Sequence, residues 1–211
     1  IRASAHPVMK EWVRTGADQR IPEGLVYRLV QSARQRLDGT PPTDSDGLEA
    51  LCLQTGSPLI EMELTLCGCD PDTSGLEQLS LKAGLAQLMR ESTGGSGQGS
   101  WWWLPLNLLA RHGVNRAGLV ESTFSVESAA LFSDLLDTQH WDLQRPSMAS
   151  ADISIENQRA RHLFVLDALY AGRFRKLREA GPMGLREGLM TAGPVDVFSA
   201  WRAARVFSRR R

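Results

Sequence analysis

Cysteine is scarce in this chain, which has three thiols in 211 residues. A chain of this length can bury a substantial core without disulfide staples, and an odd number of cysteines favours a reducing compartment. Cys67 and Cys69 are one residue apart, but no second Cys or His pair follows at the spacing of a zinc finger. We therefore interpret Cys52, Cys67 and Cys69 as small core residues, with a zinc site among them as the alternative.

Long apolar runs are also missing. No segment approaches the ~20 apolar residues that a membrane-spanning helix needs, so we expect no integral membrane protein, while attachment through a surface helix remains open. The sequence begins at Ile1 rather than at a methionine, which is compatible with a processed precursor or an unseen start. No targeting segment therefore indicates a location.

The common hydrolase and nucleotide-binding motifs are absent. The four histidines are well separated, and none lies in an HExxH or GxSxG pattern. The glycine-rich segment 94–99 follows a helical pattern and lacks the Lys-Ser/Thr ending of a phosphate-binding loop, so we interpret it as a flexible connector. The sequence predicts no metal, no cofactor and no nucleophilic triad.

Alternating strand patterns are missing too, whereas apolar residues recur at helical spacing along most of the chain. Proline, glycine and capping residues divide the chain into helical segments. We predict an all-α fold with a kink at Pro58. The predicted helices cover about 23–38, a stretch from a cap within 43–46 to Gly68, then 74–91, 104–112, 116–138, a stretch from a cap at 150 or 152 to 180, and 195–208.

Net charge is zero, but the two signs are unevenly distributed. Residues 173–211 hold ten arginines and lysines against three acids, so this part carries +7 and residues 1–172 carry −7. Such asymmetry indicates an anionic partner for the C-terminal part, namely RNA, lipid head groups or an acidic protein, with a solvated basic end as the alternative.

Aromatic residues gather at two places. Because three adjacent indoles cannot all point inward, we predict that one or two of Trp101, Trp102 and Trp103 contact a partner, a lipid interface or a covering loop. The last predicted helix combines aromatic and cationic residues, as interface anchors and peripheral membrane helices do, the alternative being a helix docked on the protein's own core. Its predicted partner-binding residues are Phe198, Trp201, Arg202, Arg205, Arg209, Arg210 and Arg211.

Two segments, 51–57 and 83–91, followed by Leu104-Pro105, occur in an order that resembles the squalene/phytoene synthase family, the head-to-head trans-isoprenyl diphosphate synthases. Segment 51–57 keeps the Cys and the Thr of the family's Tyr-Cys-x-x-Thr-Ala-Gly. Gln87, Arg90 and Glu91 stand for the Asn, the Arg and the first Asp of its second acidic motif. The resemblance covers roughly residues 7–180. It implies an isoprenoid (terpenoid) synthase-like helical bundle, N-terminally shortened, over 1–180, with a basic C-terminal extension over 181–211 that contains a short amphipathic helix.

Most of the acids that the family's chemistry needs are replaced. In catalytic members, two aspartate-rich motifs bind Mg²⁺, which prefers hard oxygen ligands and neutralises the departing diphosphate. Here Asp-x-x-Glu-Asp becomes residues 91–95, Glu-Ser-Thr-Gly-Gly, and residues 1–22 contain no Asp-x-x-x-Asp. The resemblance thus implies that Gln87, Arg90 and Glu91 are a degenerate motif without catalytic residues.

Residues 104–114, in which Leu-Pro precedes a short helix ending His-Gly-Val, most resemble the family's assembly factors of mitochondrial respiratory complex I. These members are regarded as non-catalytic and lie at the matrix side of the inner membrane. The resemblance implies a mitochondrial scaffold, an assembly factor or accessory subunit, whose partners are protein subunits of a complex and, peripherally, inner-membrane lipid. Two alternatives remain: an Mg²⁺-dependent head-to-head prenyltransferase that uses Glu91, and a mitoribosome-associated protein whose basic tail contacts RNA.

Overall fold

The computed structural model describes residues 6–69, 75–93, 101–119, 125–137, 141–147, 159–190 and 193–208. Within these ranges the chain is all-α and contains no strand, which confirms the predicted fold class. A 3₁₀ turn covers Arg116–Leu119. The helices are α1 (Pro7–Arg14), α2 (Ala17–Arg20), α3 (Glu23–Asp38), α4 (Ser45–Cys67), α5 (Leu76–Thr93), α6 (Leu106–His112), α7 (Val126–Leu136), α8 (Arg161–Ala180), α9 (Met183–Arg186) and α10 (Pro194–Ser208).

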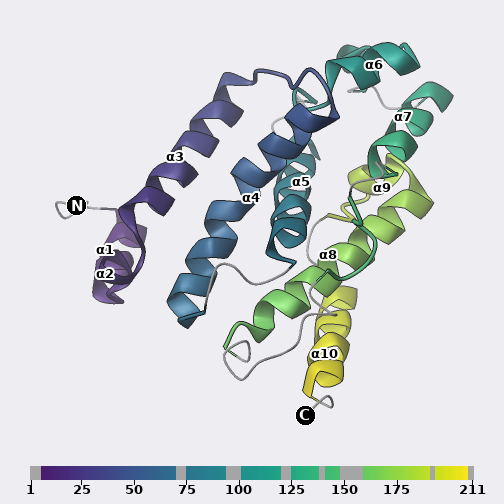
Figure 1. The fold of residues 1–211 in the computed structure, drawn as a ribbon. Coiled ribbons are helices and arrows are strands. Elements are labelled where there is room, and N and C mark those ends of the chain that lie inside the picture. Colours follow the sequence, from purple (N-terminus) through teal and green to yellow (C-terminus); the bar gives the residue numbers. More distant parts are fainter. Residues whose placement is uncertain are drawn as a thin grey trace.

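The long helices form a bundle around α5. Figure 1 shows α3 beside α4, α5 behind α4, and α8 on the far side of α5, while α6 and α7 lie together at one end. Helix α4 contacts both α3 and α5, and α8 contacts α5, α7 and α10. The layers α3, α4, α5 and α8 therefore place α5 in the interior and α3 at an edge.

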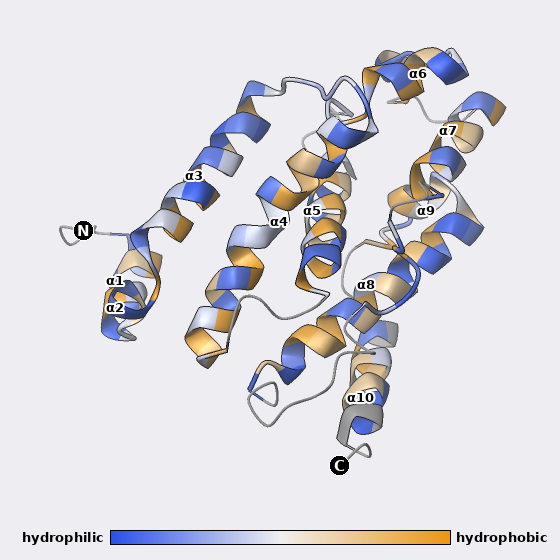
Figure 2. Ribbon diagram, viewed as in Figure 1, coloured by the Kyte–Doolittle hydropathy of each residue, from blue (hydrophilic) through white to orange (hydrophobic). Residues whose placement is uncertain are grey.

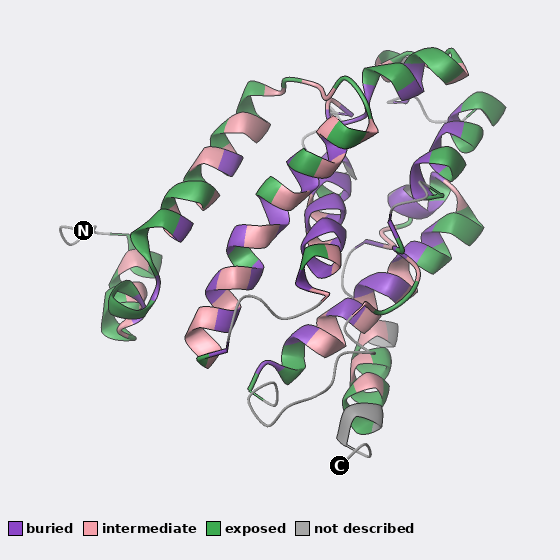
Figure 3. Ribbon diagram, in the orientation of Figure 1, coloured by how far each residue is buried: buried purple, intermediate pink, exposed green. Residues whose placement is uncertain are grey.

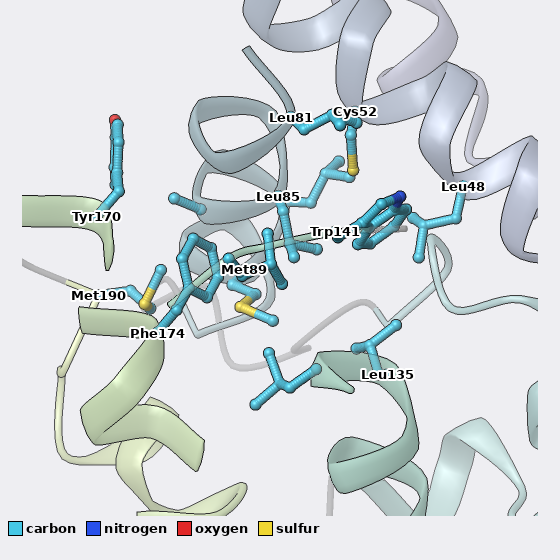
Figure 4. Packing of buried hydrophobic residues seen from close by; sticks show 14 of the residues in the cluster. Leu48, Cys52, Leu81, Leu85, Met89, Leu135, Trp141, Tyr170, Phe174 and Met190 are labelled. Atoms are coloured by element: carbon cyan, nitrogen blue, oxygen red, sulfur yellow. The ribbon is translucent and has the colours of Figure 1, made fainter. Parts of the chain in front are cut away.

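The core gathers on α5 because apolar residues occupy nearly every face of that helix. Leu79, Leu85, Leu88 and Met89 have no exposed surface, and α5 is mostly orange in Figure 2 and mostly purple in Figure 3. Figure 4 shows side chains of α4, α5, α7 and α8 meeting here. Helix α3, by contrast, buries only Leu25 and Ser32 and is largely exposed in Figure 3.

Helix α4 begins and ends where the sequence predicts. The Asp44 side chain accepts a hydrogen bond from the Gly47 backbone N–H over 2.9 Å, so it caps the first turn. Gly68 ends the helix with φ of 68°, a conformation that glycine adopts without steric cost. The helix continues through Pro58, which is buried, so the chain accepts one missing backbone donor in its interior.

Three predicted helices differ from the observed ones. A single helix over 116–138 is wrong, because the chain forms the 3₁₀ turn first and then starts α7 at Val126, where the Ser125 hydroxyl accepts a hydrogen bond from the Ser128 N–H over 3.2 Å. Helix α8 begins at Arg161 after a turn at 159–160, so no continuous helix runs from 150 or 152. Helix α5 begins at Leu76, and the predicted cap at Ser74 lies outside the described residues.

Short helices escaped prediction, whereas the C-terminal helix was anticipated. Helices α1, α2 and α9 have no counterpart among the predicted segments, and α10 matches the segment predicted at 195–208. Helices α9 and α10 both pack against α8, and the domain boundary placed at residue 180 stays a prediction. Among the helices described, none combines the length and the apolar character needed to cross a bilayer.

Candidate functional site

The residues of the predicted motif, Gln87, Arg90 and Glu91, lie near the C-terminal end of α5, where the helix meets solvent. Arg90 donates from Nη2 to the Gln87 Oε1 over 2.5 Å, and Gln87 donates from Nε2 to the Glu91 Oε1 over 2.8 Å. Arg36 of α3 places its Nε 3.2 Å from the same Glu91 oxygen. The structure therefore brings Gln87, Arg90 and Glu91 together and adds a cation from α3, which sequence reasoning missed.

These contacts change what the Glu91 carboxylate can do. One of its oxygens accepts from an amide and faces a guanidinium, so the charge that would attract a cation is largely compensated. Mg²⁺ binds through clustered hard oxygen ligands. No group of three or more His, Cys, Asp or Glu side chains is placed to hold a metal ion in the described part of the chain. The described residues thus do not fit a Mg²⁺ site, and the arrangement serves instead to fasten α5 to α3.

Ser92, the residue after Glu91, turns inward. Its hydroxyl donates to the Leu88 carbonyl over 3.1 Å and accepts from the Trp103 indole N–H over 2.6 Å. Ser92 is 3% exposed and Trp103 has no exposed surface, so this polar pair is sealed in the core. Gly94 and Gly95, which stand where the family has its next acids, lie outside the described residues.

The prediction that one or two of the three tryptophans contact a partner, a lipid interface or a covering loop does not extend to Trp101 and Trp103, which the structure places in the core. Trp101 is 4% exposed and packs edge-on against Phe132 of α7, with ring centroids 5.4 Å apart and an interplanar angle of 79°. Trp103 is held by Ser92, as described above. Trp102 is partly buried against the same core, and a partner contact for it stays a prediction. The chain turns between consecutive indoles, so two of them do point inward.

The segment Leu104-Pro105 anchors α6 to the start of α4. The backbone N–H groups of Leu106 and Asn107 donate to the carbonyls of Pro42 and Thr43, each over 3.0 Å. Helix α6 ends at Gly113, in the left-handed conformation with φ of 61°, as the sequence predicts. At this end the His112 Nε2 lies 2.8 Å from the Asp134 Oδ2, which ties α6 to α7.

Helices α4 and α5 approach closely at two glycines, Gly84 against the Cys52 backbone and Gly56 against the Ser80 backbone. A Cβ on Gly84 would lie 2.7 Å from the Cys52 carbonyl carbon and 2.8 Å from its Cα, and a Cβ on Gly56 would lie 2.9 Å from the Ser80 carbonyl carbon. Real Cβ atoms essentially never approach other atoms within 3.0 Å. The two backbones are therefore in direct contact, and no side chain separates α4 from α5 at this level.

A buried ion pair joins α5 to α8. The Lys82 ammonium lies 2.7 Å from the Asp167 Oδ1 and also donates to the Arg145 carbonyl over 2.6 Å. The Ser147 hydroxyl lies 3.2 Å from both Asp167 oxygens and 3.3 Å from the Gly75 carbonyl. Both charged side chains are fully buried, so the pair ties segment 141–147 and two helices together inside the core.

Sequence reasoning missed this pair, although the chain carries a signal for it. Lys82 lies on the apolar stripe that continues to Leu85 and Met89, and Asp167 lies on the stripe of α8 between Leu163 and Phe174. A positive charge on the apolar face of one helix and a negative charge on the apolar face of another indicate that the two charges meet in the core.

Neither of two titratable groups at the α4–α5–α8 contacts is poised for proton transfer near neutral pH. Burial raises the pKa of the Cys52 thiol, and the nearby Glu49 charge raises it further. Burial also raises the pKa of the Tyr170 hydroxyl, against the opposing charges of Arg90 and Arg173. Both groups therefore stay protonated, as expected for core residues.

Helix α10 carries the described members of the second predicted site. Phe198 and Trp201 stack with centroids 5.6 Å apart, and the Arg205 guanidinium carbon lies 4.6 Å from the centre of the Trp201 ring. Arg202 and Arg205 are exposed. The tail residues Arg209, Arg210 and Arg211 lie outside the described residues. The structure thus gathers Phe198, Trp201 and Arg205 on one face, some distance along the chain from the degenerate motif.

The comparison with known families agrees with the bundle and with the position of the motif on α5. The model of the squalene/phytoene synthase family matches residues 1–193, which include both α5 and the Leu104-Pro105 segment. No curated protein and no solved structure gives a significant match. A family match over nine-tenths of the chain, together with the all-α bundle, shows that the chain belongs to the squalene/phytoene synthase family.

Proposed function

We propose that the protein is a non-catalytic member of its family, a scaffold that acts as an assembly factor or accessory subunit of a large mitochondrial complex. The observation that carries the proposal is the state of Glu91. It is the only acid between residues 87 and 100, and its carboxylate is occupied by Gln87 and Arg36. A single compensated carboxylate cannot supply the clustered charge that diphosphate departure needs.

Packing around α5 supports the same proposal. In catalytic members of this family the second acidic motif binds the metal ions of the reaction. Here the helix that carries it packs against α4 at Gly56 and Gly84 and pairs with α8 through Lys82 and Asp167. Ser92 holds a tryptophan inside the core instead of facing a ligand. The residues around Gln87, Arg90 and Glu91 therefore stabilise the fold.

The partner proposal rests on the likeness of residues 104–114 to the complex I assembly factors. In the structure these residues form α6 with its Gly113 end, docked on the start of α4 and on α7. We take subunits of respiratory complex I, at the matrix side of the inner membrane, as the first candidate partners. Membership of a family of prenyltransferases favours catalysis as the second candidate function.

The partner proposal is tested by purifying the tagged full-length protein from mitochondria of its own cells under mild detergent. We expect a fixed set of complex I subunits or assembly intermediates to copurify and to remain after ribonuclease treatment. Copurification of ribosomal proteins and RNA that ribonuclease and high salt abolish would replace this proposal with the mitoribosomal one. Recovery of the protein alone, at native expression levels, would contradict a scaffold role.

A further inference from the structure

The outer face of α10 is an exposed stripe of apolar side chains. Val197, Phe198 and Trp201 are 73%, 60% and 51% exposed, and they lie at positions i, i+1 and i+4, on one side of the helix. Figure 3 shows exposed residues along this helix, which lies at the end of the molecule that carries the C terminus. Three large apolar residues side by side on one convex helix are a marker of a binding surface.

The inner side of α10 is held firmly on α8, so the stripe is presented in a fixed direction. The Arg173 Nη2 donates to the Asp196 Oδ2 over 2.9 Å, and the same oxygen accepts from the Gly193 N–H over 2.8 Å. Burial acts to raise the pKa of Asp196, but the hydrogen bonds and the charges of Arg173 and Lys176 bring it below its usual value. The acid of α10 is thus ionised and already paired with a cation of α8.

The charge around the stripe has one sign. From residue 197 to residue 211 the chain contains five arginines and no acid. Arg205 lies over the Trp201 ring, whose other neighbour is Phe198, so cation and aromatic rings form one unit at i, i+3 and i+7. An anionic surface complements the positive charge of these arginines. An apolar layer just beneath such a surface would accommodate the rings of Phe198 and Trp201.

We propose that α10 docks lengthwise on an anionic lipid surface, with Val197, Phe198 and Trp201 in the apolar boundary and Arg202 and Arg205 at the phosphates. Interfacial helices have this composition, and aromatic rings beside cations prefer the head-group region. The stripe is convex, and Phe198 and Trp201 are stacked on each other rather than spread as separate platforms for bases. These features favour a lipid surface over RNA. This proposal rests on the proposed function in one respect, namely that the protein is located beside a membrane.

The test is flotation of the full-length protein with two kinds of vesicle. One kind is neutral phosphatidylcholine, and the other contains about a third anionic phosphatidylglycerol. We expect binding to the anionic vesicles, weakened by salt, with little binding to the neutral ones. The double variants F198A/W201A and R202Q/R205Q should each lose roughly tenfold or more in apparent affinity. Tyr27→Ala is the matched control, because Tyr27 is an aromatic residue of α3 with 62% exposure.

Two flotation results would overturn the proposal: equal flotation of all variants, and no flotation with anionic vesicles. Binding through α10 of single-stranded RNA, or of a polyglutamate peptide, in place of vesicles would overturn it as well. All substituted residues are on the surface, so we expect each variant to keep its helices. Circular dichroism checks this. Failure here leaves the non-catalytic assignment standing, because that assignment is tested by product formation and not by membrane binding.

Discussion

The variant Gly84→Ala is expected to lose a large part of the stability of the native bundle. The added methyl would meet the carbonyl and Cα of Cys52 in α4, and these are backbone atoms that cannot rotate away as a side chain can. Overpacking of a deformable site costs ~1–3 kcal/mol, and we expect a cost of at least about 3 kcal/mol here. Since small proteins are stable by only ~5–15 kcal/mol, this loss is a large fraction of the total. Urea unfolding followed by circular dichroism measures it.

Gly172→Ala is the control for the glycine effect. Gly172 lies in the middle of α8, and a Cβ there would meet nothing within 4 Å. Alanine is the better helix former, so this variant should gain roughly 0.5–1 kcal/mol in free energy of unfolding. If both variants unfolded at the same urea concentration as the wild type, α4 and α5 would not be in backbone contact.

The second large effect is expected at the buried ion pair. Lys82→Met removes the cation and leaves the Asp167 carboxylate ionised in the core without its opposite charge, which we expect to lower the free energy of unfolding by about 3–5 kcal/mol. Replacing both partners, as in K82M/D167L, removes the uncompensated charge as well. The double variant should therefore recover most of the loss. Chemical denaturation of the wild type, Lys82→Met, Asp167→Leu and the double variant gives the coupling free energy of the pair.

The exposed pair between Arg28 and Glu61 provides the comparison. It has two hydrogen bonds, of 2.7 and 2.9 Å, but the Arg28 side chain is 47% exposed and the Glu61 side chain 28%. Arg28→Ala should cost less than about 1 kcal/mol, because solvent screens a surface pair. Equal losses in Arg28→Ala and Lys82→Met, or a double variant K82M/D167L as unstable as the sum of its single variants, would refute the account of the core.

Much of the fold follows from local signals in the sequence. Helix α3 was predicted over its observed residues, and α4 and α6 end at Gly68 and Gly113 as expected. Each of these boundaries depends on a residue beside it, a cap or a glycine, and needs no knowledge of distant parts of the chain. The start of α7 was missed although Ser125 caps it, because the apolar residues on both sides of Ser125 were interpreted as one helical stripe over 116–138.

The parts that sequence reasoning missed depend on contacts between distant segments. The inward direction of Trp103 follows from its bond to Ser92 and could not be read from the Trp-Trp-Trp run itself. Lys82 and Asp167 are 85 positions apart, and the pairing of Arg36 with Glu91 brings together residues of α3 and α5 that are also far apart in the sequence. Spacing placed Gln87, Arg90 and Glu91 on one helix, but the burial and pairing of their neighbours needed the structure.

The site and the packing together describe a family member whose second acidic motif has become part of the fold. Glu91 pairs with Arg36, Ser92 holds Trp103, and the helix that carries them is fixed on one side by Gly84 and on another by Lys82. The surface that remains for partners includes the exposed stripe of α10. We propose that binding is the activity that the chain retains.

Product formation from farnesyl or geranylgeranyl diphosphate with Mg²⁺ and a nicotinamide reductant tests this account most directly. The assay uses the full-length protein, Glu91→Ala, and Glu77→Ala as a control, since Glu77 is an exposed acid of the same helix. Glu91→Ala loses a partly exposed ion pair with Arg36 and a hydrogen bond from Gln87, together about 1–2 kcal/mol, so it stays folded. A catalytic family member assayed in parallel shows that the conditions support turnover. We predict no product from any of the three proteins; product from the wild type and Glu77→Ala that disappears in Glu91→Ala would contradict the account.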